Sequence, residues 1–191
     1  MIASFMKIGS LLTALALPFT QKTVLNRPEK METPAATTNF HSFKMKGIDG
    51  KEIDFSQFKG KKLLLVNVAS KCGYTKQYED LEKLHKQYGK NVVLIGFPSA
   101  NFGGQELGSN AEIKEFCSSK FNTTFLIAEK SNVKGEGISP LFQYLTTQTN
   151  PDFTGDIKWN FEKFLINEKG ELVHRYRSAV KPLDEQIVKN F

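Results

Sequence analysis

Two apolar runs joined by a segment of helical periodicity constrain this chain more than any other feature. The first run extends from Leu63 to Ala69, and the second extends from Val92 to Phe97 and ends at Pro98. Runs of this length without polar alternation are typical of strands buried on both faces of a sheet. Residues 74–88 between them place Tyr78, Leu81, Leu84, His85 and Tyr88 at helical spacing. Strand, helix and strand within ~35 residues form the crossover unit of a parallel sheet.

The remaining patterns complete an α/β chain. Residues 40–43 and 53–55, with a turn at Gly50, predict a hairpin. Helices are expected over 112–121, capped by Ser109 or Asn110, over 140–147, and over 183–189 after Pro182. A short strand is expected at 125–128, and 164–166 with 172–176 predict an antiparallel hairpin. The pattern resembles a thioredoxin-like fold, with a central mixed sheet flanked by helices on both faces.

The first 38 residues differ from the rest and are interpreted as a leader and a linker. Lys7 precedes an apolar run over 8–19, which is too short for a bilayer span of roughly 20 residues. The run resembles the core of a signal peptide, so export to the periplasm is favoured over a cytoplasmic location. Residues 20–38 read as a linker, and the domain is expected over 39–191. No stable membrane span is expected.

Charge and histidine placement exclude several classes of function. The formal net charge is +6, but the lysines and arginines are scattered, without the clustered basic stripe of a nucleic-acid-binding protein. The three histidines, His41, His85 and His174, are dispersed and lack ligand partners at suitable spacing. We therefore expect no nucleic-acid partner, no metal and no bound cofactor.

Cys72 follows the first buried strand and is predicted at the start of the next helix. Free backbone amides and the helix dipole stabilise a thiolate at such a position, and Lys71 adds positive charge. The carboxyl end of a parallel strand is also where open α/β sheets place active sites. An inert, space-filling cysteine is the alternative. Thr75 occupies the position where a dithiol oxidoreductase has its second cysteine, which favours single-thiol chemistry.

Three segments resemble the signatures of the glutathione peroxidase family, in the family's order. They are residues 67–73 (Asn-Val-Ala-Ser-Lys-Cys-Gly), Phe97-Pro98 with residues 101–106, and residues 158–161 with 163–165. The resemblance extends from about Asn39 to the C-terminus. It implies a thiol peroxidase in which Cys72 attacks a peroxide and becomes a sulfenic acid. It also implies that Gln105, Trp159 and Asn160 are catalytic hydrogen-bond donors around that sulfur.

The resemblance further implies a role for Cys117. In the thioredoxin-dependent branch a resolving cysteine occurs in the corresponding helix, often after phenylalanine, as in Phe116-Cys117. Sulfenic Cys72 would form a disulfide with Cys117, after local unwinding of the helix, and thioredoxin would reduce it. A structural helix cysteine is the alternative. Direct reduction by glutathione, and a peroxide sensor that passes its oxidation to a partner protein, are alternative functions.

The chain departs from the family pattern at several positions. Ser99-Ala100-Asn101 replaces the usual Cys-Asn-Gln, and Leu107 and Leu126 replace common prolines. The segment over 149–156 is short where tetrameric members carry an insertion. This shortness resembles the monomeric branch, whose open site accepts bulky lipid hydroperoxides as well as hydrogen peroxide.

Overall fold

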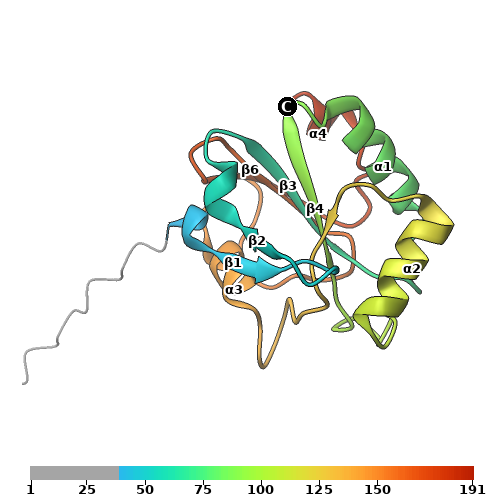
Figure 1. Ribbon diagram of the computed structural model, residues 1–191. Coiled ribbons are helices and arrows are strands. Elements are labelled where there is room, and N and C mark those ends of the chain that lie inside the picture. Colours follow the sequence, from blue (N-terminus) through green and yellow to red (C-terminus); the bar gives the residue numbers. More distant parts are fainter. Residues whose placement is uncertain (1–38) are drawn as a thin grey trace, which may run out of the picture. The chain divides into compact units, whose positions relative to one another are not determined.

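A five-stranded mixed sheet forms the centre of the domain (Figure 1). The computed structural model describes residues 39–191; the predicted leader and linker, and the export inferred from them, lie outside the described residues. The strand order is β5 (Leu126–Ile127), β4 (Val92–Pro98), β3 (Lys62–Val68), β6 (Lys163–Ile166) and β7 (Leu172–Tyr176). The pairs β3–β4 and β4–β5 are parallel, whereas β3–β6 and β6–β7 are antiparallel. The predicted mixed sheet is confirmed.

Alternation along β3 supplies two hydrophobic cores. Leu64 and Val66 point into one core, which they share with buried residues of α1 (Gln77–Tyr88), α2 (Asn110–Phe121) and α4 (Glu185–Val188). Leu63 and Leu65 point into the other core, with α3 (Pro140–Thr147). Figure 1 shows α1 and α2 on one side of the sheet and α3 on the other. The thioredoxin-like fold with helices on both faces is therefore confirmed.

The predicted helices form where local signals are strong. The Ser109 side chain accepts a hydrogen bond from the Glu112 backbone, and the Glu112 carboxylate accepts one from the Ser109 backbone. This capping box identifies Ser109 as the N-cap of α2. Pro140 opens α3 with its fixed φ. Helix α4 is shorter than predicted because Asp184 caps it and its first helical residue is Glu185.

The N-terminal hairpin is present, but its first strand was misplaced. Its strands are β1 (Lys44–Lys46) and β2 (Glu52–Asp54), with Met45 opposite Ile53. Residues 40–43 were predicted as strand, yet Phe40–Ser42 form the 3-10 helix η1. The Asn39 side chain accepts from the His41 amide at 3.0 Å and thereby closes this helical turn. A second 3-10 helix, η2, spans Phe55–Phe58.

Within residues 39–191, no helix has both the length and the apolar character needed to cross a membrane.

Candidate active site

Strand direction brings three distant segments to one edge of the sheet. The carboxyl ends of β3 and β4 lie together because these strands are parallel, with Val68 opposite Pro98. Strand β6 runs antiparallel to β3 with Lys163 opposite Val66, so its first residue lies near that same edge. The segments that continue these strands are named here the cysteine turn (residues 69–76), the glutamine loop (99–108) and the donor loop (158–162). These segments contain the parts of the three motifs that carry Cys72, Gln105, Trp159 and Asn160.

The cysteine turn holds Cys72 before α1, not on it. The Thr75 amide bonds the Cys72 carbonyl at 3.0 Å, and similar i to i+3 bonds continue until α1 begins at Gln77. The predicted position of Cys72 at the helix start is therefore wrong, because these tight turns precede the regular helix. The Thr75 hydroxyl accepts from the Cys72 amide at 2.9 Å and donates to the Ala69 carbonyl at 2.9 Å. Thr75 thus closes the turn around Cys72.

A backbone amide faces the sulfur of Cys72. The Tyr74 N–H donates to Sγ at 3.4 Å, and the side chain of Cys72 is half-buried. An amide in this position stabilises a thiolate as an oriented dipole, which replaces the contribution expected from the helix N-terminus. The adjacent Lys71 side chain is exposed to solvent.

Gln105 is bonded both to the cysteine turn and to the donor loop. Its carbonyl accepts from the Lys71 amide at 2.9 Å, and its Oε1 accepts from Asn160 Nδ2 at 3.0 Å. Because the side-chain oxygen is engaged by Asn160, the Gln105 NH₂ group is left as a donor. Gly103 and Gly104 have φ of 62° and 64°, a left-handed pair that turns the chain tightly before Gln105.

Asn67 clamps the donor loop onto β3. Its Nδ2 donates to the Trp159 carbonyl at 3.1 Å, and its Oδ1 accepts from the Glu162 amide at 2.9 Å. The Asn67 carbonyl also accepts from Phe161, a buried residue with a left-handed φ of 65°. The sequence alone predicts no role for Asn67. The pattern that could have indicated one is a single polar residue inside an apolar strand, and Asn67 is fully buried.

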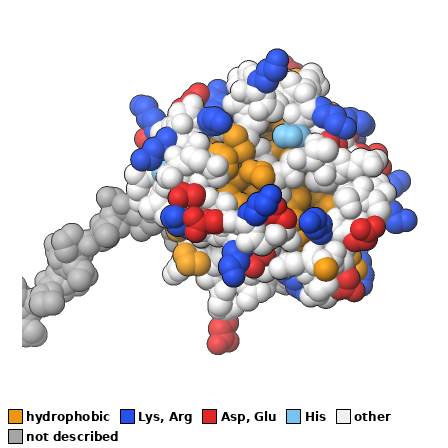
Figure 2. All heavy atoms as spheres, viewed as in Figure 1, with side chains coloured by type: hydrophobic (Ala, Val, Ile, Leu, Met, Phe, Trp, Pro, Cys, Tyr) orange, Lys and Arg blue, Asp and Glu red, His pale blue; other side chains and the backbone are white. Residues whose placement is uncertain are grey.

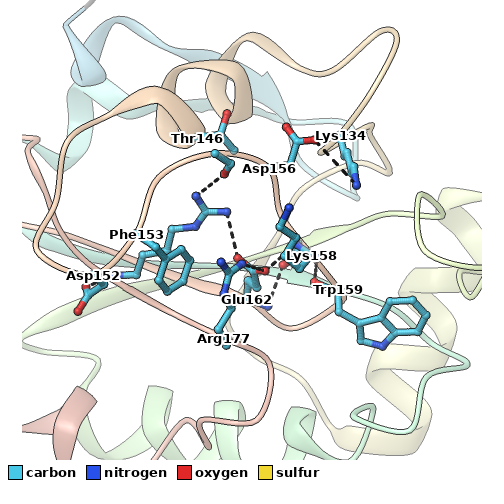
Figure 3. A network of polar contacts seen from close by, with 12 residues as sticks. Lys134, Thr146, Asp152, Phe153, Asp156, Lys158, Trp159, Glu162 and Arg177 are labelled. Atoms are coloured by element: carbon cyan, nitrogen blue, oxygen red, sulfur yellow. Dashed lines mark hydrogen bonds and ion pairs between the residues drawn. The ribbon is translucent and has the colours of Figure 1, made fainter.

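Glu162 closes the donor loop and is itself held by two arginines (Figure 3). Its Oε1 accepts from the Lys158 amide at 2.7 Å and from Arg177 Nη1 at 2.7 Å, while Oε2 contacts Arg175 Nη2 at 3.1 Å. The side chains of Glu162 and Arg175 are fully buried. Arg177 lies over the Phe153 ring, 3.6 Å from its centroid. The network therefore fixes both ends of the five-residue donor loop (158–162), which carries Trp159 and Asn160.

Lys163 connects the donor loop to the start of α1. Its buried ammonium donates to Gln77 Oε1 at 2.6 Å and to the Phe161 carbonyl at 2.9 Å. Burial lowers the pKa of Lys163 to about 7, while the neighbouring Glu162 acts in the opposite direction. The contact ties the residue after the donor loop to the helix that follows the cysteine turn.

Two exposed aromatic rings belong to these segments. Trp159 is 40% exposed and packs on Phe102, with ring centroids 5.8 Å apart. Figure 3 shows its indole pointing away from the Glu162 network. Tyr74 in the cysteine turn is 37% exposed. The segments that carry Cys72 and Asn160 therefore each present an aromatic surface to solvent.

Cys117 lies in α2 and is buried, and both cysteines are free thiols. Burial raises the pKa of Cys117 to about 11; the Tyr78 hydroxyl lowers it and the Glu106 carboxylate raises it further. Cys117 also lines a cavity of about 490 Å³, together with Phe125 and the exposed Leu126. Figure 2 shows hydrophobic side chains gathered in a hollow on the face that carries the β1–β2 hairpin and α2. In this conformation Cys117 is a weak nucleophile.

The geometry therefore links Gln105 and Asn160 directly and attaches both to the segment that carries Cys72. Trp159 lies in the donor loop with Asn160, whereas Cys117 lies in a different element, helix α2. In the described part of the chain, no cluster of three or more His, Cys, Asp or Glu side chains could hold a metal ion.

Comparison with known proteins identifies relatives of the whole domain. The family profile described as glutathione peroxidase matches residues 40–146. The glutathione peroxidase-like peroxiredoxin 2 of Saccharomyces cerevisiae is 46% identical over 156 residues, covering 79% of this chain and 96% of the relative. The hydroperoxy fatty acid reductase gpx1 of Synechocystis is 41% identical over 157 residues, covering 78% of this chain and 93% of the relative. The crystal structure of Trypanosoma cruzi (T. cruzi) GPX1 aligns with a TM-score of 0.61 at 32% identity, covering 80% of this chain and 92% of that structure.

Proposed function

The chain belongs to the glutathione peroxidase family and is a thiol peroxidase of hydroperoxides, and we propose that Cys72 is its peroxidatic residue. The observation that carries this proposal is the amide of Tyr74 donating to the Cys72 sulfur, beside a loop pair joined by the Gln105–Asn160 hydrogen bond. A half-buried thiol among oriented, uncharged donors suits attack on a neutral peroxide.

The first chemical step oxidises Cys72. Its thiolate attacks one peroxide oxygen, an S–O bond forms and the O–O bond breaks. The sulfur loses two electrons and becomes sulfenic acid. The second oxygen takes up, through solvent, the proton that the thiol released on ionisation and departs as water or an alcohol. We assign Gln105 and Trp159 as donors toward the sulfur and the leaving oxygen. Asn160 orients Gln105 through the hydrogen bond to its side-chain oxygen.

Cys117 is proposed as the resolving cysteine. Its thiol attacks the sulfenic sulfur of Cys72, an S–S bond forms, the S–O bond breaks and water leaves. Its burial in α2 supports a mechanism in which the helix opens before this step. A thioredoxin-like dithiol protein then reduces the disulfide and returns both sulfurs to thiols. The competing routes are direct reduction of sulfenic Cys72 by glutathione and transfer of the oxidation to a partner protein.

Organic hydroperoxides are proposed as substrates beside hydrogen peroxide. The exposed rings of Tyr74 and Trp159 support this proposal, because they offer apolar contact area on the segments that carry Cys72 and Asn160. The name of the Synechocystis relative, a hydroperoxy fatty acid reductase, points to the same class of substrate. The short segment before Trp159 supports action as a monomer, which sedimentation equilibrium tests.

Stopped-flow peroxide consumption tests these assignments. We expect Cys72→Ser to abolish turnover, and Cys117→Ser to keep one round of peroxide reduction but lose turnover with thioredoxin. Full activity in Cys72→Ser would refute the peroxidatic role. Unchanged thioredoxin-dependent turnover in Cys117→Ser would refute the resolving role, and turnover of that variant with glutathione would support the competing route. If neither thioredoxin nor glutathione reduces oxidised Cys72, but another protein becomes oxidised by it, the result would support the peroxide sensor.

A further inference from the structure

The cavity of about 490 Å³ beside α2 lies outside the candidate active site. None of the residues that line it belongs to the cysteine turn, the glutamine loop or the donor loop. The β1–β2 hairpin, η2 and the segment after α2 form its apolar wall, through Ile48, Ile53, Phe58, Phe125, Leu126 and Ile127. Figure 2 shows this hollow with charged side chains around it. Apolar cavities of about 300–1,000 Å³ are the usual binding sites of small molecules.

Helix α2 contributes a cation and a thiol to the lining of this cavity. Lys114 and Cys117 both line it, and because they are three residues apart they are neighbours on the helix surface. The lining carboxylates Asp49 and Glu52 each form an ion pair with a lysine of the hairpin, at 3.6 and 2.9 Å, whereas Lys114 forms no ion pair within residues 39–191. The charge of Lys114 is therefore available to an anionic ligand.

A hydroxyl group without a partner lines the same cavity. Thr123 Oγ1 is buried, and no group in the described part of the chain forms a hydrogen bond with it. The chain turns back at Asn122, whose φ is 49°, and the Thr123 amide then donates to the Cys117 carbonyl at 3.1 Å. Thr123 is thereby held beside Cys117, as is Lys114 on the preceding turn of α2. Buried hydroxyl groups are normally hydrogen-bonded in folded proteins, so this one is free to bind a polar group of a ligand.

We propose that this cavity binds a fatty-acid anion, with the carboxylate at Lys114 and Thr123 and the alkyl chain against the apolar wall. The Thr123 hydroxyl donates to one carboxylate oxygen, and the Lys114 ammonium neutralises the charge. The alkyl chain covers Leu126, which is 42% exposed, and so removes apolar surface from water. An inorganic anion would lack the apolar contact and a neutral alcohol would lack the ion pair. This binding site does not depend on a resolving role for Cys117.

Isothermal titration calorimetry of the full chain with decanoate tests the proposal. We expect saturable binding of one decanoate per chain, weakened about fivefold in Lys114→Gln, which is the contribution of one exposed ion pair. Decanol has the same alkyl chain without the charge and should bind wild type and Lys114→Gln equally. Thr123→Val keeps the shape and should weaken decanoate binding, yet leave the urea midpoint unchanged because the hydroxyl has no partner. Lys120→Gln removes an exposed α2 lysine that does not line the cavity, and this matched control should bind decanoate like the wild type.

Two further measurements locate the bound decanoate. Ser118 lines the cavity from an exposed position on α2, so Ser118→Trp should fill the cavity and abolish the binding of both decanoate and decanol. Decanoate should also protect the Cys117 thiol from iodoacetamide, measured by mass spectrometry in the Cys72→Ser background. Because decanoate binds only the closed conformation, a concentration of ten times its Kd should slow the labelling about tenfold. The urea midpoint of each variant reports whether it is folded.

Several outcomes would overturn the proposal. The wild type would then show no saturable binding of decanoate, or Ser118→Trp would still bind it, which would place decanoate elsewhere. Equal affinities of wild type, Lys114→Gln and Thr123→Val would refute the carboxylate contacts. Dimerisation that Ser118→Trp abolishes and decanoate does not affect would assign the cavity to a second copy of the chain. None of these outcomes bears on peroxide consumption, whose failure would refute the proposed function alone.

Discussion

Replacing Glu162 by glutamine should destabilise the protein strongly, because the change leaves a buried cation without its counter-charge. Glu162 and Arg175 are both fully buried and 3.1 Å apart. A glutamine at 162 retains one oxygen for the Lys158 amide and Arg177, but its NH₂ group then faces the Arg175 guanidinium. Breaking a buried pair in this way costs about 3–5 kcal/mol.

Arg177→Gln is the matched comparison. Arg177 contacts the same carboxylate at 2.7 Å, but its side chain is 39% exposed and Arg175 remains to neutralise Glu162. Loss of an exposed ion pair and of the contact with Phe153 costs about 1–2 kcal/mol. Glu162→Gln should therefore be the less stable variant, by about 1–4 kcal/mol.

Urea unfolding measures the difference. The chain has one tryptophan, Trp159, whose fluorescence reports on the donor loop, and circular dichroism reports on the whole domain. The free energy of unfolding falls by about 2 kcal/mol for each molar increase in urea. The urea midpoint should therefore fall by about 2 M in Glu162→Gln and by less than about 1 M in Arg177→Gln. Equal midpoints for the two variants, or a smaller loss in Glu162→Gln, would refute the reasoning about burial.

Three further variants test other parts of the fold. Asn67→Ala leaves buried backbone groups of the donor loop unpaired, so unfolding should show a loss of about 2–4 kcal/mol; a loss below about 1 kcal/mol would contradict the clamp. The folded-state pKa of Cys117 is raised from 9.0 to about 11. The unfolded chain therefore loses this proton first as pH rises, and stability should fall by about 2 kcal/mol between pH 9 and 11. Cys117→Ala should lack this contribution, and identical pH slopes in the two proteins would refute it. Gly170→Ala combines a φ of +85° with a Cβ only 3.0 Å from the His41 ring, whereas Gly50→Ala at +83° meets nothing. In thermal unfolding, Gly170→Ala should lose about 2–4 kcal/mol of stability and Gly50→Ala about 1 kcal/mol. Equal losses in the two variants would contradict the steric difference.

The parts of the fold that sequence predicted are those with strong local signals. The nearly continuous apolar runs of β3 and β4, the capping residues of α2 and Pro140 of α3 each act within a few residues. The prediction of a strand at 40–43 is wrong because Phe40 fits the alternating pattern of a strand, whereas the Asn39 side chain caps a 3-10 helix that begins at Phe40. The predicted start of α1 directly after Cys72 is wrong because successive tight turns occupy the residues before Gln77, and such turns fit the same hydrophobic spacing as a helix.

The residues that support the site could not be predicted, because their contacts depend on strand pairings between segments far apart in the sequence. Asn67 and Glu162 meet only because β6 lies antiparallel to β3. The buried carboxyl of Glu106 has the same sequence appearance as an exposed one. Its burial, and its hydrogen bonds to Ser70 in the cysteine turn, arise only when the glutamine loop packs against that turn.

The direction of the strands also determines where this protein can be lengthened or cut. The cysteine turn, the glutamine loop and the donor loop all leave the same edge of the sheet. The connection over 89–91, between α1 and β4, lies at the other edge, and its residues are exposed. An inserted tag, a fused domain or a pair of new chain ends at this connection would therefore leave the three segments and their spacing untouched.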